Sequence, residues 1–449
     1  MNKKLVPLLL VGLLFFAFLT RVFRLHDPQR YIFDEVYHVV TVKLIAQNDP
    51  RAYEWWHPAP EKDTAIDWLH PPLAKLTQAA FVNLLGVSSF SWRFSSAVFG
   101  VGVIWLTFIL AKNVFQDEKI GLLAAFLAAL DGLLLVQSRI AMNDIHVTFF
   151  ILLALIFYHR FSLNRHQKKW LLLTGLGAGL AMASKWSGIF VLGIVGLMEL
   201  KDWLSRLKEI MHKPLSDILK ELPIYAFSLI ILPGMIYLLA YGQMFLQGKG
   251  LTHFIGLHQQ IWAYQTGLTA THGYQSRPGQ WFLNMRPVWF HVVYGENTIA
   301  NIYAFGNPLL NWLGAAAVII SVLTLSLKKY LAHVISKKSL KQLLKELRPL
   351  AFLVIAYLTV WLPWQLSPRI MFYYHYTPAI PLLCIILSYW LMKLWRRQVK
   401  SDVNWYQVGV LSAIGLILMT FLIWYPHWTA LPVPKSFADQ VYFALPQWK

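Results

Sequence analysis

The chain has a single cysteine, Cys384, among its 449 residues. One cysteine allows neither an internal disulfide nor a cysteine-based metal site. Charged residues are also scarce, at 14%, whereas apolar residues make up 57% and the mean hydropathy is +0.49. This composition is too apolar for a soluble domain and indicates a protein that crosses a membrane many times.

Stretches almost free of Asp, Glu, Lys and Arg predict the membrane spans. They cover residues 5–20, 94–111, 120–138, 145–159, 170–184, 186–198, 222–248, 308–327, 349–368, 370–392 and 403–434. A helix needs about 20 residues to cross the hydrocarbon, although about 17 can suffice. We therefore expect an all-α polytopic membrane protein with about eleven transmembrane helices. No small-x-small cleavage site follows the first stretch, which we interpret as an uncleaved span.

The distribution of basic residues predicts the orientation. If residues 1–4 are cytoplasmic and the spans alternate, the cytoplasmic side holds 24 of the 40 Lys and Arg and 9 of the 21 Asp and Glu. The excess of positive charge inside agrees with the positive-inside rule. Most of the formal +19 charge then lies against anionic lipid headgroups, and charge alone gives no reason to expect a nucleic-acid partner. We expect a multi-pass protein of the cell membrane with a cytoplasmic N-terminus.

Two long connections lie on the predicted external side, at about residues 25–90 and 247–307, and a C-terminal transmembrane part follows at about 308–449. We find no tandem repeat, no low-complexity tail and no soluble domain. The whole chain, 1–449, is therefore interpreted as one membrane unit.

Ionisable residues near the predicted external span ends are the candidates for chemistry. They are Asp34, Glu35, Lys75, Arg93, Arg139, Asp144, Lys185, Arg286 and Arg369. Each is costly alone near a membrane, so acids and bases that converge at one depth indicate a site. Simpler interpretations stay open: a cap or salt bridge for the Asp34-Glu35 pair, a structural ion pair for Arg139 and Asp144, and a snorkelling side chain for Lys185.

Carboxylates beside several cations suit transfer from a phosphate-linked donor. A base takes the proton of an acceptor hydroxyl while cations stabilise the departing phosphate. Arg286 and Arg369 could each bind phosphate with a guanidinium fork. No Gly-rich nucleotide loop occurs, which disfavours a nucleotide-sugar donor. The histidines show no ligand spacing, so we name no metal ligand and expect no cofactor, while a divalent metal stays open.

Seven short motifs occur in order along the chain. They are Phe33-Asp34-Glu35-Val36, His70-Pro71-Pro72-Leu73-Ala74-Lys75, Leu130-Asp131-Gly132 with Gln137-Ser138-Arg139 and Asp144, Ser184-Lys185-Trp186-Ser187-Gly188, Gly267-Leu268-Thr269-Ala270-Thr271-His272, Arg286-Pro287-Val288-Trp289 and Tyr374-His375-Tyr376-Thr377-Pro378-Ala379. This series resembles the dolichyl-phosphate-mannose–protein mannosyltransferases, in the small form expected of prokaryotes, and covers nearly the whole chain.

The resemblance implies a GT-C fold, an active site on the external face, and inverting transfer of mannose from a polyprenyl phosphate to Ser or Thr. Asp34 would be the general base with Glu35 beside it, and Arg93 would support their loop. The other expected substrate contacts are Arg139, Asp144, Lys185, His272, Arg286, Arg369 and His375. Implied partners are the polyprenyl-phosphate sugar donor, a protein or glycan acceptor and membrane lipids, with a dimer as an option.

Two features depart from the family pattern. Eukaryotic members insert a β-trefoil domain in the large loop, for which about 60 residues leave no room. The family also often places histidine directly after Asp-Glu-Val, where this chain has Tyr37 followed by His38. Two alternatives to a protein mannosyltransferase remain: a related transferase acting on a lipid or cell-envelope glycan, and a lipid or sugar carrier that makes no bond.

Overall fold

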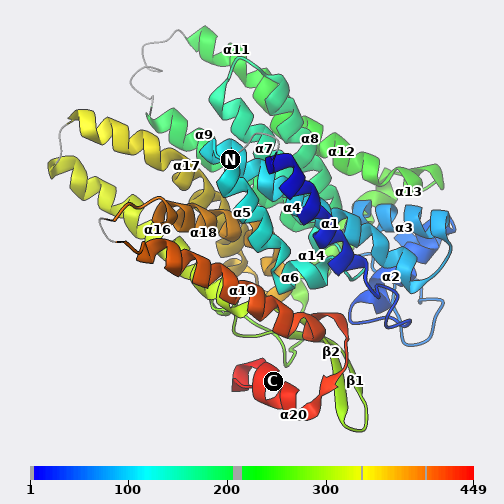
Figure 1. Cartoon of the computed structure of the whole chain (residues 1–449). Helices are drawn as coiled ribbons and strands as arrows, with labels where there is room; N and C mark the ends of the chain where they lie inside the picture. The colour runs from blue at the N-terminus through cyan, green and yellow to red at the C-terminus, as the bar shows by residue number, and fades with distance from the viewer. Residues whose placement is uncertain (1–4, 206–214, 335–336, 400–401) are drawn as a thin grey trace.

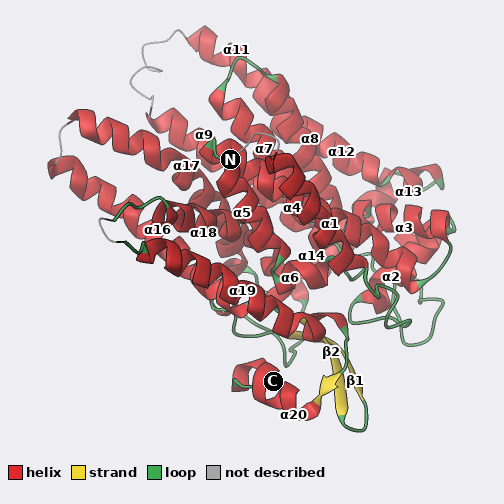
Figure 2. Cartoon of the chain, in the orientation of Figure 1, coloured by secondary structure: helices red, strands yellow, loops and turns green. Residues whose placement is uncertain are grey.

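The computed structural model describes residues 5–205, 215–334, 337–399 and 402–449. Long helices run alongside one another through most of the molecule (Figures 1 and 2). Eight helical stretches in the described ranges are long and apolar enough to cross a membrane: Leu5–Val22, Ser89–Phe115, Asp144–Leu163, Leu219–Ala240, Pro308–Leu327, Glu346–Leu366, Tyr373–Trp395 and Trp405–Thr429. The prediction of a mostly helical, polytopic membrane protein is confirmed.

These eight stretches correspond to the following elements of the structure. They are α1 (Leu5–Val22), α4 (Ser89–Phe115), α7 (Asp144–Leu163), α11 (Leu215–Ala226) with η3 (Phe227–Ile231) and α12 (Leu232–Ala240), α16 (Pro308–Val334), α17 (Lys337–Trp361) with η4 (Leu362–Leu366), η5 (Tyr373–Ala379) with α18 (Ile380–Trp395), and α19 (Trp405–Thr429).

The predicted count of eleven spans is not confirmed. The other three predicted spans do form helices, but short ones: α5 (Glu118–Ala129) with α6 (Gly132–Gln137), α8 (Lys169–Ser184), and η2 (Trp186–Ile189) with α9 (Phe190–Ser205). Asp131 interrupts the first of them, because its carboxylate accepts a hydrogen bond from the Leu134 amide at 2.9 Å and so caps α6.

Glycines let α8 approach its neighbours closely. A Cβ atom at Gly175 would lie 1.7 Å from the Ser228 carbonyl oxygen in η3, and one at Gly179 would lie 3.0 Å from Cα of Pro233 in α12. Small residues commonly permit such contacts between membrane helices. The end of α8 also lies beside α7, because Lys185 directly after α8 pairs with Asp144 at the start of α7.

The first long connection forms α2 (Glu35–Ala46), η1 (Pro50–Tyr53) and α3 (Leu73–Leu85). These elements lie at one side of the bundle, near α13 (Gly242–Leu246) (Figure 1). Tyr53 of η1 donates a hydrogen bond to Gln243 of α13 at 2.8 Å. The connection is therefore anchored to the transmembrane part.

The second long connection contains α14 (Leu251–Gly267), α15 (Pro278–Phe282) and two strands. Strand β1 (Val288–Tyr294) pairs antiparallel with β2 (Thr298–Ala304), with Val288 opposite Ala304 and an irregularity between Trp289 and His291. A two-residue strand, β3 (Val433–Pro434), adds to β2 (Figure 2). The chain ends in α20 (Lys435–Phe437), η6 (Ala438–Tyr442) and η7 (Pro446–Trp448). This small sheet was not part of the all-helical prediction.

Candidate active site

Asp34 is the residue that precedes α2, and its loop is held by aromatic packing. Phe33 has a left-handed backbone, with φ of 46°. Its ring stacks on Phe290 of β1 at 4.2 Å between centroids and meets Phe372 and Tyr374 edge-on at 6.5 and 5.8 Å. Such a conformation is uncommon for a bulky residue, and it persists only where surrounding contacts hold it. The Asp34 loop is thus clamped against the second long connection and the start of η5.

Glu35 lies next to Asp34 but has a different environment. Its side chain is fully buried and accepts two hydrogen bonds from Arg93, at 2.8 and 2.7 Å. It also accepts from the backbone amides of Ile32 and Ala141, both at 3.1 Å. Four donors satisfy this carboxylate, so its contacts are those of a group that fixes the loop.

All three nitrogens of the Arg93 guanidinium donate hydrogen bonds in the same loop. Besides Glu35, it donates to the carbonyl oxygens of Leu25, Pro28 and Arg30 at 3.2, 2.9 and 3.0 Å. The side chain is 1% exposed. The structure therefore places Arg93 in support of the Asp-Glu loop, with its donors already engaged.

Asp34 itself is partly buried among charged groups from several elements. Burial raises the pKa of Asp34 to about 6, an effect that His38 and Lys185 oppose and that Asp67 and Asp144 reinforce. The group can therefore exist in either protonation state near neutral pH, as a general base requires.

Lys185 and Asp144 form a buried ion pair beside Asp34. Nζ of Lys185, after α8, lies 2.8 Å from Oδ1 of Asp144 at the start of α7. The second oxygen of Asp144 is buried and makes no hydrogen bond to the part of the chain that is described. The pair thus brings the Lys185 ammonium into the site. The Asp144 carboxylate stays buried with only one of its two oxygens bonded, which is energetically unfavourable.

The C-terminal half contributes Tyr374, His375 and Arg369. Tyr374 lies close enough to Asp34 to interact with it electrostatically, and its ring lies 5.5 Å from the Lys185 ammonium. Charges on Lys185 and Arg369 act on His375, whose Nδ1 lies 3.0 Å from the Phe372 carbonyl oxygen. Arg369 also donates to Gln265 of α14. The structure thus brings Asp34, Asp144, Lys185, Arg369 and His375 into one region.

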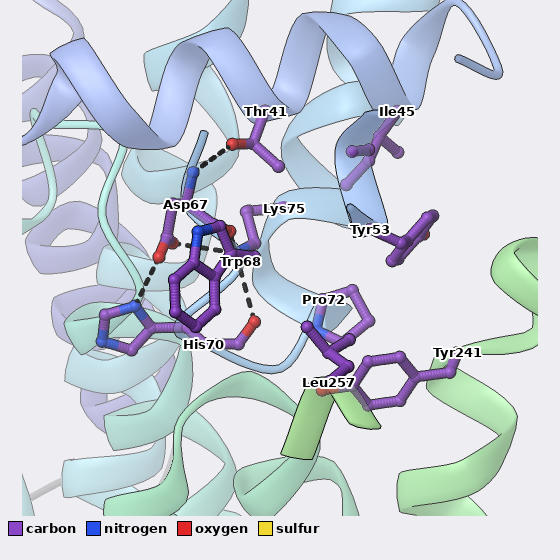
Figure 3. A pocket seen from close by; sticks show the side chains of 11 residues that line it. Thr41, Ile45, Tyr53, Asp67, Trp68, His70, Pro72, Lys75, Tyr241 and Leu257 are labelled. Atoms are coloured by element: carbon purple, nitrogen blue, oxygen red, sulfur yellow. Dashed lines mark hydrogen bonds and ion pairs between the residues drawn. The ribbon is translucent and has the colours of Figure 1, made fainter. Parts of the chain in front are cut away.

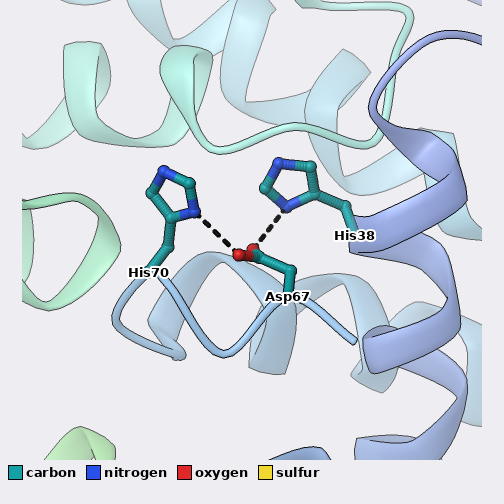
Figure 4. A group of neighbouring side chains, drawn as sticks. All are labelled: His38, Asp67 and His70. Carbon is teal, nitrogen blue, oxygen red and sulfur yellow. Dashed lines mark hydrogen bonds and ion pairs between the residues drawn. The ribbon is translucent and has the colours of Figure 1, made fainter. Parts of the chain in front are cut away.

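A second carboxylate, Asp67, gathers a cluster next to this group. Nδ1 of His70 and Nδ1 of His38 lie 2.9 and 3.0 Å from its two oxygens (Figure 4). Lys75 reaches Oδ2 of Asp67 at 2.8 Å and also the carbonyl oxygens of Asp67 and His70 (Figure 3). Burial opposes ionisation of Asp67, but His70, Lys75 and His38 together hold its pKa well below the usual range.

The same cluster is a candidate metal site within the described ranges. The ligand atoms of His38, Asp67 and His70 all lie within 4.8 Å of one another. Two imidazoles and a carboxylate are ligands that Zn²⁺ accepts. However, the Lys75 ammonium already contacts the Asp67 carboxylate, so the cluster has its countercharge without a metal ion.

Arg139 binds the end of α1 instead of the group around Asp34. Its guanidinium donates to the carbonyl oxygens of Thr20, Arg21, Phe23 and Arg24 at the end of α1, at 3.3, 2.8, 2.8 and 3.4 Å. It caps this helix, as a cation at a C-terminus commonly does. The ion pair between Arg139 and Asp144 that the spacing suggested does not form, because Asp144 pairs with Lys185.

His272 and Arg286 lie further out in the second long connection. The exposed His272 ring lies 5.6 Å from Tyr274 and 5.4 Å from Phe372. Arg286 is partly exposed, is near enough to Tyr274 to interact electrostatically, and makes no hydrogen bond or ion pair to residues in the described ranges. His272 thus meets Phe372, a ring neighbour of Phe33. Arg286 lies near Tyr274, another ring neighbour of His272.

Sequence reasoning missed four residues of this region: His38, Asp67, His70 and Tyr374. His70 and Tyr374 belong to quoted motifs, and His38 lies one turn after Asp34 on α2. No motif or spacing in the sequence indicated Asp67. Its role depends on the path of the loop between α2 and α3, which no periodicity predicts.

Taken together, the site offers a carboxylate poised to ionise, a lysine and an arginine beside it, and a separate histidine cluster. This set suits removal of a hydroxyl proton next to a group that develops negative charge.

Comparison with protein families places most of the chain in one group. The model described as "Dolichyl-phosphate-mannose-protein mannosyltransferase" matches residues 69–246. The model described as "C-terminal four TMM region of protein-O-mannosyltransferase" matches residues 250–444.

Similar curated proteins carry the name polyprenol-phosphate-mannose–protein mannosyltransferase. The one from Corynebacterium glutamicum is 25% identical over 445 residues, covering 85% of this chain and 81% of that protein. The one from Mycobacterium tuberculosis (strain H37Rv) is 22% identical, with the same coverage.

Solved structures share the fold. The S. cerevisiae protein O-mannosyltransferase Pmt1-Pmt2 complex bound to the sugar donor contains a chain that matches with a TM-score of 0.80 and 15% identity, covering 98% of this chain and 92% of that one. ArnT from Cupriavidus metallidurans bound to undecaprenyl phosphate matches with a TM-score of 0.58 and 13% identity, over 96% of this chain and 77% of that one.

Proposed function

Because the chain belongs to the dolichyl-phosphate-mannose–protein mannosyltransferase family, we propose that it transfers mannose from a polyprenyl phosphate to Ser or Thr hydroxyls of proteins. Its fold is the GT-C fold that the resemblance implied. The observation that carries the mechanism is the position of Asp34, whose pKa burial raises to about 6, among Lys185, Tyr374 and Asp144.

Asp34 acts as the general base in this proposal. Its carboxylate takes the proton of the acceptor hydroxyl, whose oxygen forms a bond to the anomeric carbon. The bond from that carbon to the phosphate oxygen breaks on the opposite side, and polyprenyl phosphate leaves with the electron pair. The anomeric configuration is therefore inverted.

Lys185 and Arg369 meet the phosphate. The leaving phosphate gains negative charge as the bond breaks, and fixed cations in a partly dehydrated site stabilise that charge more than they would in water. Asp144 holds Lys185 in place at 2.8 Å. His375 and Tyr374 line the same side from η5, and Arg286 and His272 form the outer rim, where an acceptor would approach.

Glu35, Arg93 and Arg139 have supporting roles. Glu35 and Arg93 hold the Asp34 loop through their buried pair, and Arg139 holds the end of α1 from which that loop starts. None of the three then needs to touch substrate.

We place the site on the external face of the cell membrane, with a cytoplasmic N-terminus, because that orientation puts the excess of basic residues inside. The experiment uses cysteine labelling, since the native Cys384 is fully buried. A membrane-impermeant thiol reagent applied to intact cells should label a cysteine at exposed His57 and should not label one at exposed His166. The reverse pattern would move the site to the cytoplasm.

The activity is tested with purified protein, labelled polyprenyl-phosphate mannose and a Ser/Thr peptide. The expected products are mannosylated peptide and free polyprenyl phosphate. A carrier would leave the peptide unlabelled, and a transferase for envelope glycans would label only a glycan acceptor. Light scattering of the same preparation would show whether the chain forms a dimer.

A further inference from the structure

His70 is held by one ring nitrogen and leaves the other available. Its Nδ1 lies 2.9 Å from Oδ1 of Asp67, and Figure 4 shows the second nitrogen pointing away from that carboxylate. The side chain is 24% exposed, whereas that of Asp67 is 3% exposed. No residue in the described ranges forms a hydrogen bond with Nε2 of His70.

The partner of Nδ1 determines what Nε2 can do. An ionised carboxylate accepts hydrogen bonds and donates none, so Nδ1 carries the ring proton. In the neutral imidazole, which prevails above the ordinary pKa of about 6.5, the nitrogen without the proton has a free lone pair. With Nδ1 protonated, Nε2 is therefore a hydrogen-bond acceptor.

His70 also lies close to the groups that we assign to the phosphate. The charge of Lys185 acts on His70, so the two side chains lie near each other. An acceptor nitrogen cannot bind a phosphate oxygen, which is itself an acceptor. It can bind a hydroxyl, of which a hexose carries several.

We propose that Nε2 of His70 accepts a hydrogen bond from a hydroxyl of the donor hexose, and that Asp67 is the positioning residue that keeps His70 in this state. This inference rests on the proposed function, which supplies the hexose donor. His38 also approaches Asp67, with Nδ1 3.0 Å from Oδ2 and a side chain that is 6% exposed, but without the geometry of a hydrogen bond.

The backbone from residue 67 to residue 70 is held by contacts that do not involve the imidazole of His70. Lys75 bonds the carbonyl oxygens of Asp67 and His70 at 2.6 and 3.2 Å, and Thr41 accepts from the Asp67 amide at 2.7 Å (Figure 3). These contacts hold the backbone from 67 to 70. The ring is therefore available for a ligand.

Two near-isosteric substitutions separate the roles of the two nitrogens. The amide of His70→Asn reaches the place of Nδ1 and keeps the contact with Asp67. The amide of His70→Gln reaches the place of Nε2 and keeps a group that can accept from the sugar. If Nε2 binds the hexose, His70→Asn loses about tenfold in kcat/KM for polyprenyl-phosphate mannose and His70→Gln loses less.

Selectivity provides a readout that does not depend on the folded fraction of each variant. A series of polyprenyl-phosphate deoxymannose donors, each lacking one hydroxyl, is compared with the mannose donor. The wild type should prefer mannose by about tenfold over one member of the series, and His70→Asn should lose that preference. The same substitution at the exposed His166 should change neither quantity.

The outcomes are distinct. If the wild type transfers no mannose, the proposed function fails. If the wild type is active but His70→Gln is the more impaired variant, or His70→Asn keeps the full donor selectivity, His70 acts only through its contact with Asp67 and the inference is overturned.

Discussion

Nζ of Lys185 lies 2.8 Å from Oδ1 of Asp144, which joins the end of α8 to the start of α7 by one buried ion pair. The two side chains are 9% and 3% exposed. Lys185 can stabilise the charge of a leaving phosphate only if the Asp144 carboxylate does not fully neutralise its ammonium. The unpartnered second oxygen of Asp144 suggests that stability and activity can be separated here.

Lys185→Gln should lower turnover by at least about a hundredfold, because the fixed cation at the leaving phosphate is lost. It should also cost about 3–5 kcal/mol of stability, because Asp144 remains as a buried unpaired charge. Adding Asp144→Asn should restore the melting temperature without restoring turnover. Recovered turnover in the double variant would remove Lys185 from the mechanism.

Asp34→Asn should lower transfer by about 10²–10⁴-fold while the protein stays folded. In the wild type, kcat/KM should rise with pH and level off above about 6, because the ionised form is the base and burial raises the pKa of Asp34 to about 6. A pH–rate profile measures this limb. An unchanged limb in the variant would assign it to another group.

The raised pKa of Asp34 also predicts how the stability of the folded protein changes with pH. Since the pKa of Asp34 is raised from 3.8 to about 6, its proton stabilises the folded state below pH 4, and this contribution is lost as the pH rises through 6. Asp34→Asn should therefore melt at a higher temperature than the wild type at pH 8 but not at pH 4. Thermal unfolding at the two pH values in the same detergent tests the sign.

Glu35→Gln should destabilise the protein by about 3–5 kcal/mol, since it leaves Arg93 buried without its countercharge. The matched control is Glu118→Gln, which breaks an exposed ion pair with Lys112 at 2.6 Å and should cost at most about 1 kcal/mol. Equal losses in the two variants would show that the buried pair does not hold the loop.

Chelation of divalent metals should leave transfer unchanged, because Lys75 already provides the countercharge of Asp67 at 2.8 Å. Activity is compared before and after treatment with EDTA, and again after adding Mn²⁺, Mg²⁺ or Zn²⁺. A loss that one of these ions reverses would assign a metal to the His38, Asp67 and His70 cluster.

Gly175→Ala should destabilise the bundle, because the new methyl group would meet the Ser228 carbonyl oxygen, 1.7 Å from its Cβ position. Gly196→Ala in α9 is the control, since its Cβ position has no neighbour within 4 Å. Alanine in a helix interior should stabilise that variant by about 0.5–1 kcal/mol. Melting temperatures of the two variants compare them directly.

The fold was predictable to the extent that it depends on runs of apolar residues. The long helices follow directly from those runs. The count of eleven spans is not confirmed, because hydropathy does not show where a helix begins or stops. That point depends on local events such as the capping of α6 by Asp131.

The site was predictable where ionisable residues stand near span ends, as Asp34, Asp144 and Lys185 do. The partners were not predictable from spacing. Arg139 and Asp144 are five residues apart, yet each binds a different part of the chain. Asp67 was missed because its importance arises from three partners that only the folded loop brings together.

Phe33 connects the first long connection with the region that the C-terminal family model matches. It precedes Asp34 and lies among Phe290, Phe372 and Tyr374, which come much later in the chain. A chimera that takes its N-terminal part from one relative and its C-terminal part from another would have to match these rings. The packing of these rings therefore limits which N-terminal and C-terminal parts of family members can be combined in one folded chain.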